Sequence, residues 1–232
     1  MAGTIRLPSR ILAHTGSVAM ESESIGRSGA DVLRIGDMYL KIAPENALHR
    51  SALAQEYFHM KGLSAPLIDY VCEDGRDWLL VQAVPGRYAC DRLLMSEPDR
   101  LARTLGETVR MLHETNADGC PLDCANLRAL KAYENEAGAA FPGDLSPLRR
   151  DALIHGDMCL PNIFFDGFRF TGFIDLGDAG PGDRHFDLYW AMWSLEYNLK
   201  TPQYNGIFMD AYGRDAFDEA RYELCAAISK GV

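Results

Sequence analysis

The sequence predicts an α+β fold of two lobes, a small β-rich N-lobe over residues 1–84 and a larger, mainly helical C-lobe over residues 85–232. Two observations predict it. Short apolar or alternating runs, separated by turn residues, dominate the first part, which is typical of strands. Beyond Val84-Pro85-Gly86 the apolar residues recur with helical spacing, so this break marks the joint between the lobes.

The N-lobe elements are expected to be strands in two antiparallel pairs with one helix between them. Turn residues, such as Gly36-Asp37, separate the members of each pair. The predicted strands are residues 31–33, 38–42, 66–72 and 78–83. Residues 44–61 fit a helix, and Gly62 would end it as a C-cap.

The C-lobe is expected to combine helices with a few short strands. Ser96 has the side chain of an N-cap, and residues 97–114 after it place leucines and a valine on one helical face. Further helices are predicted at residues 127–137, 186–199, 202–213 and 216–229. Strands are predicted at residues 152–155, 163–165 and 170–174.

The composition, 47% hydrophobic and 24% charged, is that of a soluble globular protein. No apolar run reaches the roughly 18 residues of a membrane span, and the first residues lack the pattern of a secretion signal. We therefore expect a cytoplasmic protein without a membrane partner. The six cysteines are scattered, with only Cys120 and Cys124 close together, which favours reduced thiols over disulfides or a zinc site.

The net charge of −10 argues against a nucleic-acid partner. The excess is uneven, because residues 1–84 carry 8 basic and 10 acidic side chains and residues 85–232 carry 15 and 23. A solvated acidic surface would explain this, and so would a cleft that attracts a polycationic small molecule.

The most informative stretch runs from His155 to Gly177. Asp157 precedes Asn162 by five residues, and Asp175 opens an Asp-Leu-Gly triplet eighteen residues after Asp157. A kinase catalytic loop has the same Asp-x-x-x-x-Asn spacing, followed by an Asp-x-Gly metal site. One carboxylate would accept the proton of an attacking hydroxyl, while the amide and the second carboxylate hold magnesium on the nucleotide phosphates. The stretch therefore predicts phosphoryl transfer.

Weaker N-lobe features follow the order that a kinase requires. The Gly26–Gly29 turn could approach phosphates, although such turns are more often plain hairpins. Lys41 lies in an apolar strand, where either a phosphate or solvent at the sheet edge could receive its ammonium group. Glu56 on the following helix could pair with Lys41, with Glu45 as a competitor. Together these features favour nucleotide binding.

Three more polar residues have a structural interpretation. His155 is expected to fix the catalytic loop by hydrogen bonds, because a single histidine is a poor argument for a metal site. Asp183 and Asp187 flank Arg184, and we expect this cluster to support the loop and the start of the next helix.

The chain resembles the aminoglycoside phosphotransferase family, and in particular the 3′-type kanamycin kinases. The resemblance covers nearly the whole chain, and its central motif is highly specific. The segments that carry it are residues 39–42, 77–81, 110–113, 120–123, 153–163, 171–177 and 182–188. It implies a two-lobed, protein-kinase-like fold and in-line transfer of the γ-phosphoryl group of ATP, with Mg2+, to a substrate hydroxyl. GTP remains an alternative donor.

The resemblance also implies a role for each matching residue. Asp157 would be the catalytic base, and Asn162 and Asp175 the magnesium ligands. Residues on the nucleotide side would be Ser28, Lys41 held by Glu56, Tyr39 stacked on adenine, and the Gln82 carbonyl and Val84 N–H at the adenine edge.

Two departures concern the substrate side. Relatives usually carry arginine after the Asp-x-Gly triplet, whereas this chain has Asp178. The end of the chain lacks the acidic and aromatic residues that hold the ammonium groups of the antibiotic in 3′-type enzymes. Candidate replacements are Glu134, Glu136, Asp215, Asp218, Glu219 and Glu223.

The sequence therefore predicts an ATP-dependent aminoglycoside kinase that confers resistance and acts as a monomer or weak dimer. One alternative is a kinase of another hydroxylated metabolite, such as choline or homoserine. A less favoured alternative is a nucleotide-binding module without catalysis, since dead relatives usually lose the base or a metal ligand.

Overall fold

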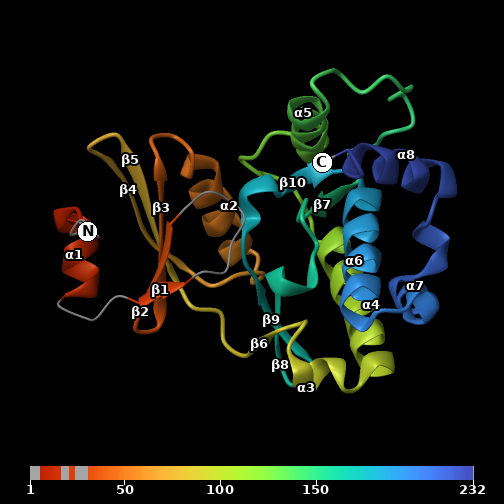
Figure 1. Ribbon diagram of the computed structural model, residues 1–232, viewed down its shortest axis with the longest axis horizontal. Coiled ribbons are helices and arrows are strands. Elements are labelled where there is room, and N and C mark those ends of the chain that lie inside the picture. The colour runs from red at the N-terminus through yellow and green to blue at the C-terminus, as the bar shows by residue number, and fades with distance from the viewer. Residues whose placement is uncertain (1–5, 17–20, 24–30, 232) are drawn as a thin grey trace. The chain divides into compact units, whose positions relative to one another are not determined.

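The computed structural model describes residues 6–16, 21–23 and 31–231. Contacts between residues divide the chain into two compact units, Met1–Ala83 and Val84–Val232 (Figure 1). The first unit is built mainly of strands and the second mainly of helices, so the predicted α+β architecture is confirmed.

The first unit contains a five-stranded antiparallel sheet with the strand order β1-β2-β3-β5-β4. Its strands are β1 (Glu21–Glu23), β2 (Asp31–Ile35), β3 (Met38–Pro44), β4 (Leu67–Glu73) and β5 (Arg76–Gln82). Strand β3 lies in the middle of this sheet, and Lys41 on it faces Leu79 of β5 across the ladder. Its neighbours Leu40 and Ile42 are buried on the opposite face, because side chains alternate along a strand.

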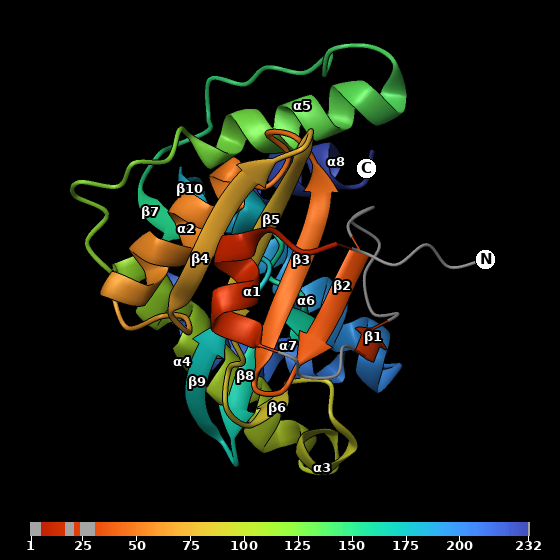
Figure 2. The ribbon, with the colours of Figure 1, turned by 90° about the vertical axis from the view of Figure 1, so that its left-hand side faces the viewer.

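Two helices cover the two faces of this sheet. Helix α1 (Ser9–Thr15) lies across one face, where fully buried Ile11 packs with strand residues such as Leu40 and Trp78 (Figure 2). Helix α2 (His49–Met60) belongs to the other face, where Ala52 packs with Leu79. The first unit therefore has a small core on each side of its sheet.

The second unit is built mainly of helices. They are α3 (Arg92–Met95), α4 (Pro98–Glu114), α5 (Ala125–Ala137), α6 (Arg184–Leu199), α7 (Asn205–Tyr212) and α8 (Glu219–Ser229). Short 3-10 turns, η1 (Leu160–Asn162), η2 (Leu176–Asp178), η3 (Pro202–Tyr204) and η4 (Arg214–Ala216), lie between elements. Gly106 of α4 allows α7 to approach closely, since a Cβ at this position would lie 2.4 Å from the Phe208 carbonyl oxygen.

Two small antiparallel sheets hold the loops of this unit. Strand β7 (Ala152–Ile154) pairs with β10 (Gly180–Gly182), and β8 (Ile163–Asp166) lies between β6 (Arg87–Tyr88) and β9 (Arg169–Phe173). The turns that leave β7 and β9 carry the residues of the predicted catalytic motif.

Several expected elements differ in detail. Helix α1, strand β6 and helix α3 were not expected, because each is too short to show a clear period in the sequence. The prediction that Ser96 caps the long helix was wrong. Ser96 instead follows α3, where its hydroxyl donates to the Leu93 carbonyl at 2.7 Å, and Pro98 starts α4.

Within the described ranges, none of the helices has the length and apolar character needed to cross a membrane.

Candidate active site

The loop between β7 and β8 holds Asp157 and Asn162 in direct contact. The Asn162 amide nitrogen donates to Asp157 Oδ2 at 2.9 Å and to the Asp157 carbonyl at 3.0 Å. Turn η1 creates this contact, because it folds the five-residue spacing back on itself. Asp157 is partly exposed, so its carboxylate remains accessible. Asn162 is only 8% exposed, and its hydrogen bond fixes the orientation of that carboxylate.

His155 holds this loop through both ring nitrogens. Nε2 lies 2.9 Å from the Ile174 carbonyl oxygen, and the Asp157 backbone N–H donates to Nδ1 at 3.2 Å. Because a carbonyl can only accept and an N–H can only donate, these partners assign the proton to Nε2. The structural role expected for His155 is therefore observed, and it ties Asp157 to the strand that ends before Asp175.

Asp187 on α6 anchors the same loop from inside the unit. Its side chain is fully buried and accepts the backbone N–H groups of His155 at 2.7 Å and Gly156 at 2.8 Å. His113 Nε2 lies 3.2 Å from the same carboxylate, and His113 Nδ1 lies 2.9 Å from the hydroxyl of Tyr212. Burial raises the pKa of Tyr212 to about 12, so this hydroxyl stays protonated and can donate.

Asp175 has a backbone conformation that few residues adopt. Its φ of 60° and ψ of 54° are left-handed, which costs of order 1–3 kcal/mol for a residue other than glycine. A backbone hydrogen bond of 3.0 Å from the Ile174 N–H to the Asn162 carbonyl brings the start of the Asp-Leu-Gly turn beside the catalytic loop. The structure therefore brings Asp157, Asn162 and Asp175 together in one place within the second unit.

Asn162 and Asp175 fit the donor set that Mg2+ prefers. The Asn162 amide nitrogen is bonded to Asp157, which leaves its amide oxygen as the atom suited to a hard cation. Among the described residues, no group of three or more His, Cys, Asp or Glu side chains could hold a metal. Two protein oxygens are nevertheless enough for magnesium that is shared with nucleotide phosphates.

Cys159 contacts the predicted base. Burial raises the pKa of its thiol, and the nearby Asp157 carboxylate raises it further, so the thiol remains neutral and can donate to that carboxylate. Ser194 on α6 contacts the same loop, because its hydroxyl accepts the Leu160 backbone N–H at 3.0 Å. The sequence analysis gave neither residue a role, because Cys159 occupies a position of the central motif to which no function was assigned and Ser194 lies outside that motif.

The second buried carboxylate, Asp183, supports the start of α6. Its carboxylate accepts from the Arg149 backbone N–H at 2.8 Å, from the His185 N–H at 3.0 Å and from Arg221 Nε at 3.0 Å. Burial raises the pKa of Asp183, but these hydrogen bonds outweigh it and hold the pKa below its ordinary value. The expectation that Asp183 and Asp187 support the loop and helix start agrees with these contacts.

Asp178, the unusual residue after the Asp-x-Gly triplet, pairs with Arg128 of α5. Arg128 Nε and Nη2 lie 3.1 and 3.0 Å from the same oxygen, Asp178 Oδ1. The two side chains are 41% and 52% exposed. This partner could not be predicted from the sequence, because the two residues are fifty positions apart.

The predicted nucleotide residues of the first unit lie on its sheet. Tyr39 and Lys41 alternate with buried Leu40 and Ile42 along β3, so they lie on the sheet face that α2 covers. Gln82 ends β5, and its side-chain amide donates to the Asp37 carboxylate at 2.7 Å. In the second unit, Val84 is buried at the start of the chain segment that follows. Ser28 lies outside the described residues.

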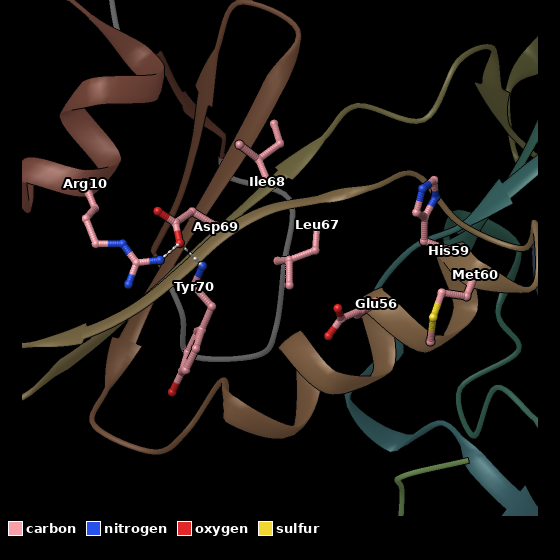
Figure 3. A pocket seen from close by; sticks show the side chains of 8 residues that line it. All are labelled: Arg10, Glu56, His59, Met60, Leu67, Ile68, Asp69 and Tyr70. Atoms are coloured by element: carbon pink, nitrogen blue, oxygen red, sulfur yellow. Dashed lines mark hydrogen bonds and ion pairs between the residues drawn. The ribbon is translucent and has the colours of Figure 1, made fainter. Parts of the chain in front are cut away.

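Glu56 is exposed on α2 and lines a pocket of about 450 Å³ at the β4 edge (Figure 3). Arg10 of α1 pairs with Asp69 on the opposite side of this pocket. The pairing of Glu56 with Lys41 stays a prediction.

Comparison with known proteins identifies the family. Residues 24–225 match the phosphotransferase enzyme family. A probable aminoglycoside 3′-phosphotransferase of Lactococcus lactis subsp. lactis is 39% identical over 207 residues, which cover 80% of this chain and 79% of the relative. The chain belongs to the aminoglycoside phosphotransferase family.

Solved structures of aminoglycoside phosphotransferases share its fold. A type VIII aminoglycoside 3′-phosphotransferase matches with a TM-score of 0.74 and 24% identity over 96% of this chain and 98% of its own. An enzyme from Streptomyces rimosus in complex with ADP and streptomycin matches with a TM-score of 0.73 and 20% identity over 95% of each chain. The predicted protein-kinase-like fold is therefore confirmed.

Proposed function

We propose that this protein transfers the γ-phosphoryl group of ATP to a hydroxyl group of an aminoglycoside antibiotic. The observation that carries the proposal is the contact of Asp157 with Asn162 beside Asp175, in a chain related to aminoglycoside 3′-phosphotransferases. The ADP and streptomycin bound to the Streptomyces rimosus structure support the same nucleotide and substrate class.

Asp157 is the proposed catalytic base. It accepts the proton of the substrate hydroxyl as the hydroxyl oxygen attacks the γ-phosphorus in line with the departing ADP oxygen. The Asn162 amide fixes the direction of the carboxylate, and Asp187 and His155 hold the backbone beneath it. These residues position the base without contacting the reacting atoms. Most of the catalysis then comes from positioning and charge neutralisation.

The proposed nucleotide contacts come from the first unit and the joint. Lys41 contacts the phosphates and is held by Glu56, while the Ser28 hydroxyl binds on the phosphate side. Tyr39 stacks on adenine, and the Gln82 carbonyl and Val84 N–H read its edge. Since backbone atoms read the base, GTP is an alternative donor.

Asn162 and Asp175 are the proposed magnesium ligands. They would hold Mg2+ on the nucleotide phosphates, where the metal would supply positive charge to neutralise the phosphate oxygens. Asn162 is suited to bind the metal because its amide nitrogen is already hydrogen-bonded to Asp157, which leaves the amide oxygen for Mg2+.

Phosphorylation of an antibiotic would give resistance. We propose that the reaction takes place in the cytoplasm, because ATP is available in that compartment.

A substrate screen with purified protein tests this proposal. ATP or GTP is offered with kanamycin-class and streptomycin-class drugs, and with choline and homoserine. We expect phosphoryl transfer to at least one aminoglycoside. Transfer to choline or homoserine alone would show that the substrate class is wrong.

Substitution of the base provides the matched test of mechanism. Asp157→Ala should reduce kcat by about 10³-fold while ATP still binds, because the base acts only in the chemical step. Asp166→Ala, which removes an exposed carboxylate at the end of β8, is the control and should leave kcat unchanged. Undiminished turnover by Asp157→Ala would exclude Asp157 as the base.

A further inference from the structure

We propose that Asp178 binds an ammonium group of the substrate, and that Arg128 competes with the substrate for this carboxylate. The pair would then set how strongly the enzyme prefers polycationic substrates. This inference rests on the proposed function and adds a specificity-determining residue to it.

Asp178 lies directly beside the loop of the proposed base. Gly156, which precedes Asp157, has a φ of +85°, and a Cβ built on it would lie 2.5 Å from the Asp178 carbonyl oxygen and 2.9 Å from the Asp178 Cβ. The two backbones therefore touch, and the Asp178 side chain starts next to the base. An aminoglycoside that presents a hydroxyl to Asp157 would then bring a neighbouring amino group of its ring close to Asp178.

The contact between Arg128 and Asp178 is of a kind that another cation can replace. Arg128 donates both of its hydrogen bonds with Asp178 to the same oxygen, Oδ1, so it does not bind the carboxylate through both carboxylate oxygens. Both side chains are roughly half exposed. An ion pair in such a position is weak, because water competes with the partners for each charge.

The pair is not needed to hold α5 in place. Ala125 is buried in the core of the second unit with residues of α6 and α8. The Asn126 side chain donates to the Arg149 carbonyl at 2.7 Å and accepts the Asp183 backbone N–H at 2.7 Å. Because these contacts already fix the first turn of α5, the charges of Arg128 and Asp178 are available for a ligand.

The charges predict opposite effects for the two partners. Asp178 attracts an ammonium group, whereas Arg128 both repels it and occupies the carboxylate. Two unit charges about 5 Å apart in water change binding about fourfold. Removal of the carboxylate should therefore weaken binding of a polycation, and removal of the guanidinium should strengthen it.

The test measures kcat and KM for kanamycin, and the Kd for kanamycin by calorimetry, for the wild type, Asp178→Asn, Arg128→Met and the double variant. We expect Asp178→Asn to raise KM and Kd about fourfold or more, and Arg128→Met to lower both by about fourfold. In both variants kcat should stay within twofold. Asp210→Asn and Arg214→Met alter an exposed pair on α7 and η4 by the same charges, so they control for the net charge of the protein.

The outcomes separate this inference from the proposed function. If the wild type phosphorylates kanamycin but both substitutions raise KM, or neither changes it, the pair is a structural contact and the inference is wrong. If the wild type does not phosphorylate any aminoglycoside, the proposed function fails, and calorimetry still decides the inference. Opposite shifts in Kd would support it, and absence of kanamycin binding would overturn it as well.

Discussion

Two sets of carboxylates in the second unit are held in opposite ways. Asp183 and Asp187 are fully buried and each accepts several hydrogen bonds, most of them from backbone N–H groups or buried side chains. Asp178 is 52% exposed and pairs with Arg128, which is 41% exposed. Buried carboxylates with fixed donors make a rigid support, whereas an exposed pair can exchange its partner. The loop of the proposed base Asp157 is thus supported by carboxylates of the first kind, and Asp178 beside it is of the second kind.

Asp187→Asn should have the largest effect. One carboxylate oxygen becomes an amide N–H that faces donors such as the Gly156 N–H or His113, so a buried donor loses its partner. We expect the free energy of unfolding to fall by about 3 kcal/mol and kcat to fall by about 10²-fold, with KM for ATP little changed. Denaturant unfolding and steady-state kinetics measure both.

The control for Asp187→Asn is Asp210→Asn. Asp210 pairs with Arg214 one helical turn away and both are more than half exposed. This substitution should alter the free energy of unfolding by less than about 1 kcal/mol. If the two substitutions destabilise the protein equally, burial is not what distinguishes the supporting carboxylates.

Asp183→Asn should change how stability depends on acid. The pKa of Asp183 is below its ordinary value in the folded protein, so its contribution to stability is present above the unfolded pKa of about 3.9 and is lost as the pH falls through the lower folded pKa. The variant should be less stable by about 3 kcal/mol at pH 7, because Arg221 and His185 lose a buried charged partner.

The measurement is the free energy of unfolding of the wild type and Asp183→Asn between pH 3 and pH 7. The difference between the two proteins should shrink as the pH falls below about 4. A difference that is constant down to pH 3 would mean that the charge of Asp183 does not stabilise the fold.

Arg128→Met should have the smallest effect on stability. The pair with Asp178 is roughly half exposed, and such pairs contribute about 0–1 kcal/mol. We expect a change in unfolding free energy of less than about 0.5 kcal/mol, together with the lower KM for kanamycin described above. If Arg128→Met lowered the free energy of unfolding by several kcal/mol, the pair would be a structural contact like those of Asp183 and Asp187, and the difference between exposed and buried carboxylates would not hold.

Much of the site could be predicted from sequence because its residues are close along the chain. The spacing of Asp157 and Asn162 predicted that the two residues belong to one catalytic loop, and in the structure one short turn brings them into contact. The interpretation of His155 as a loop support followed from chemistry alone, and its two hydrogen bonds agree with it. Lys41 was expected on a strand and lies on β3, although its proposed pairing with Glu56 is still a prediction.

The residues that hold the catalytic loop from distant parts of the chain could not be predicted in the same way. His113 lies on α4 and Ser194 on α6, and neither carries a signal that points to the loop they hold. Helix α1 is equally invisible, because seven residues give too short a pattern and its burial through Ile11 depends on the sheet. Ser96 misled the prediction because a good capping side chain is also suited to the end of a preceding short helix.

The sequence by itself determined the two-part α+β architecture and the chemistry of the central loop. Strand and helix periods are local properties, and the catalytic spacing depends on a single turn. The tertiary structure decided which charges meet across the fold, and above all that Arg128 reaches Asp178. That pairing depends on how α5 packs against the core of the second unit, and no local pattern encodes the packing of a helix fifty residues away.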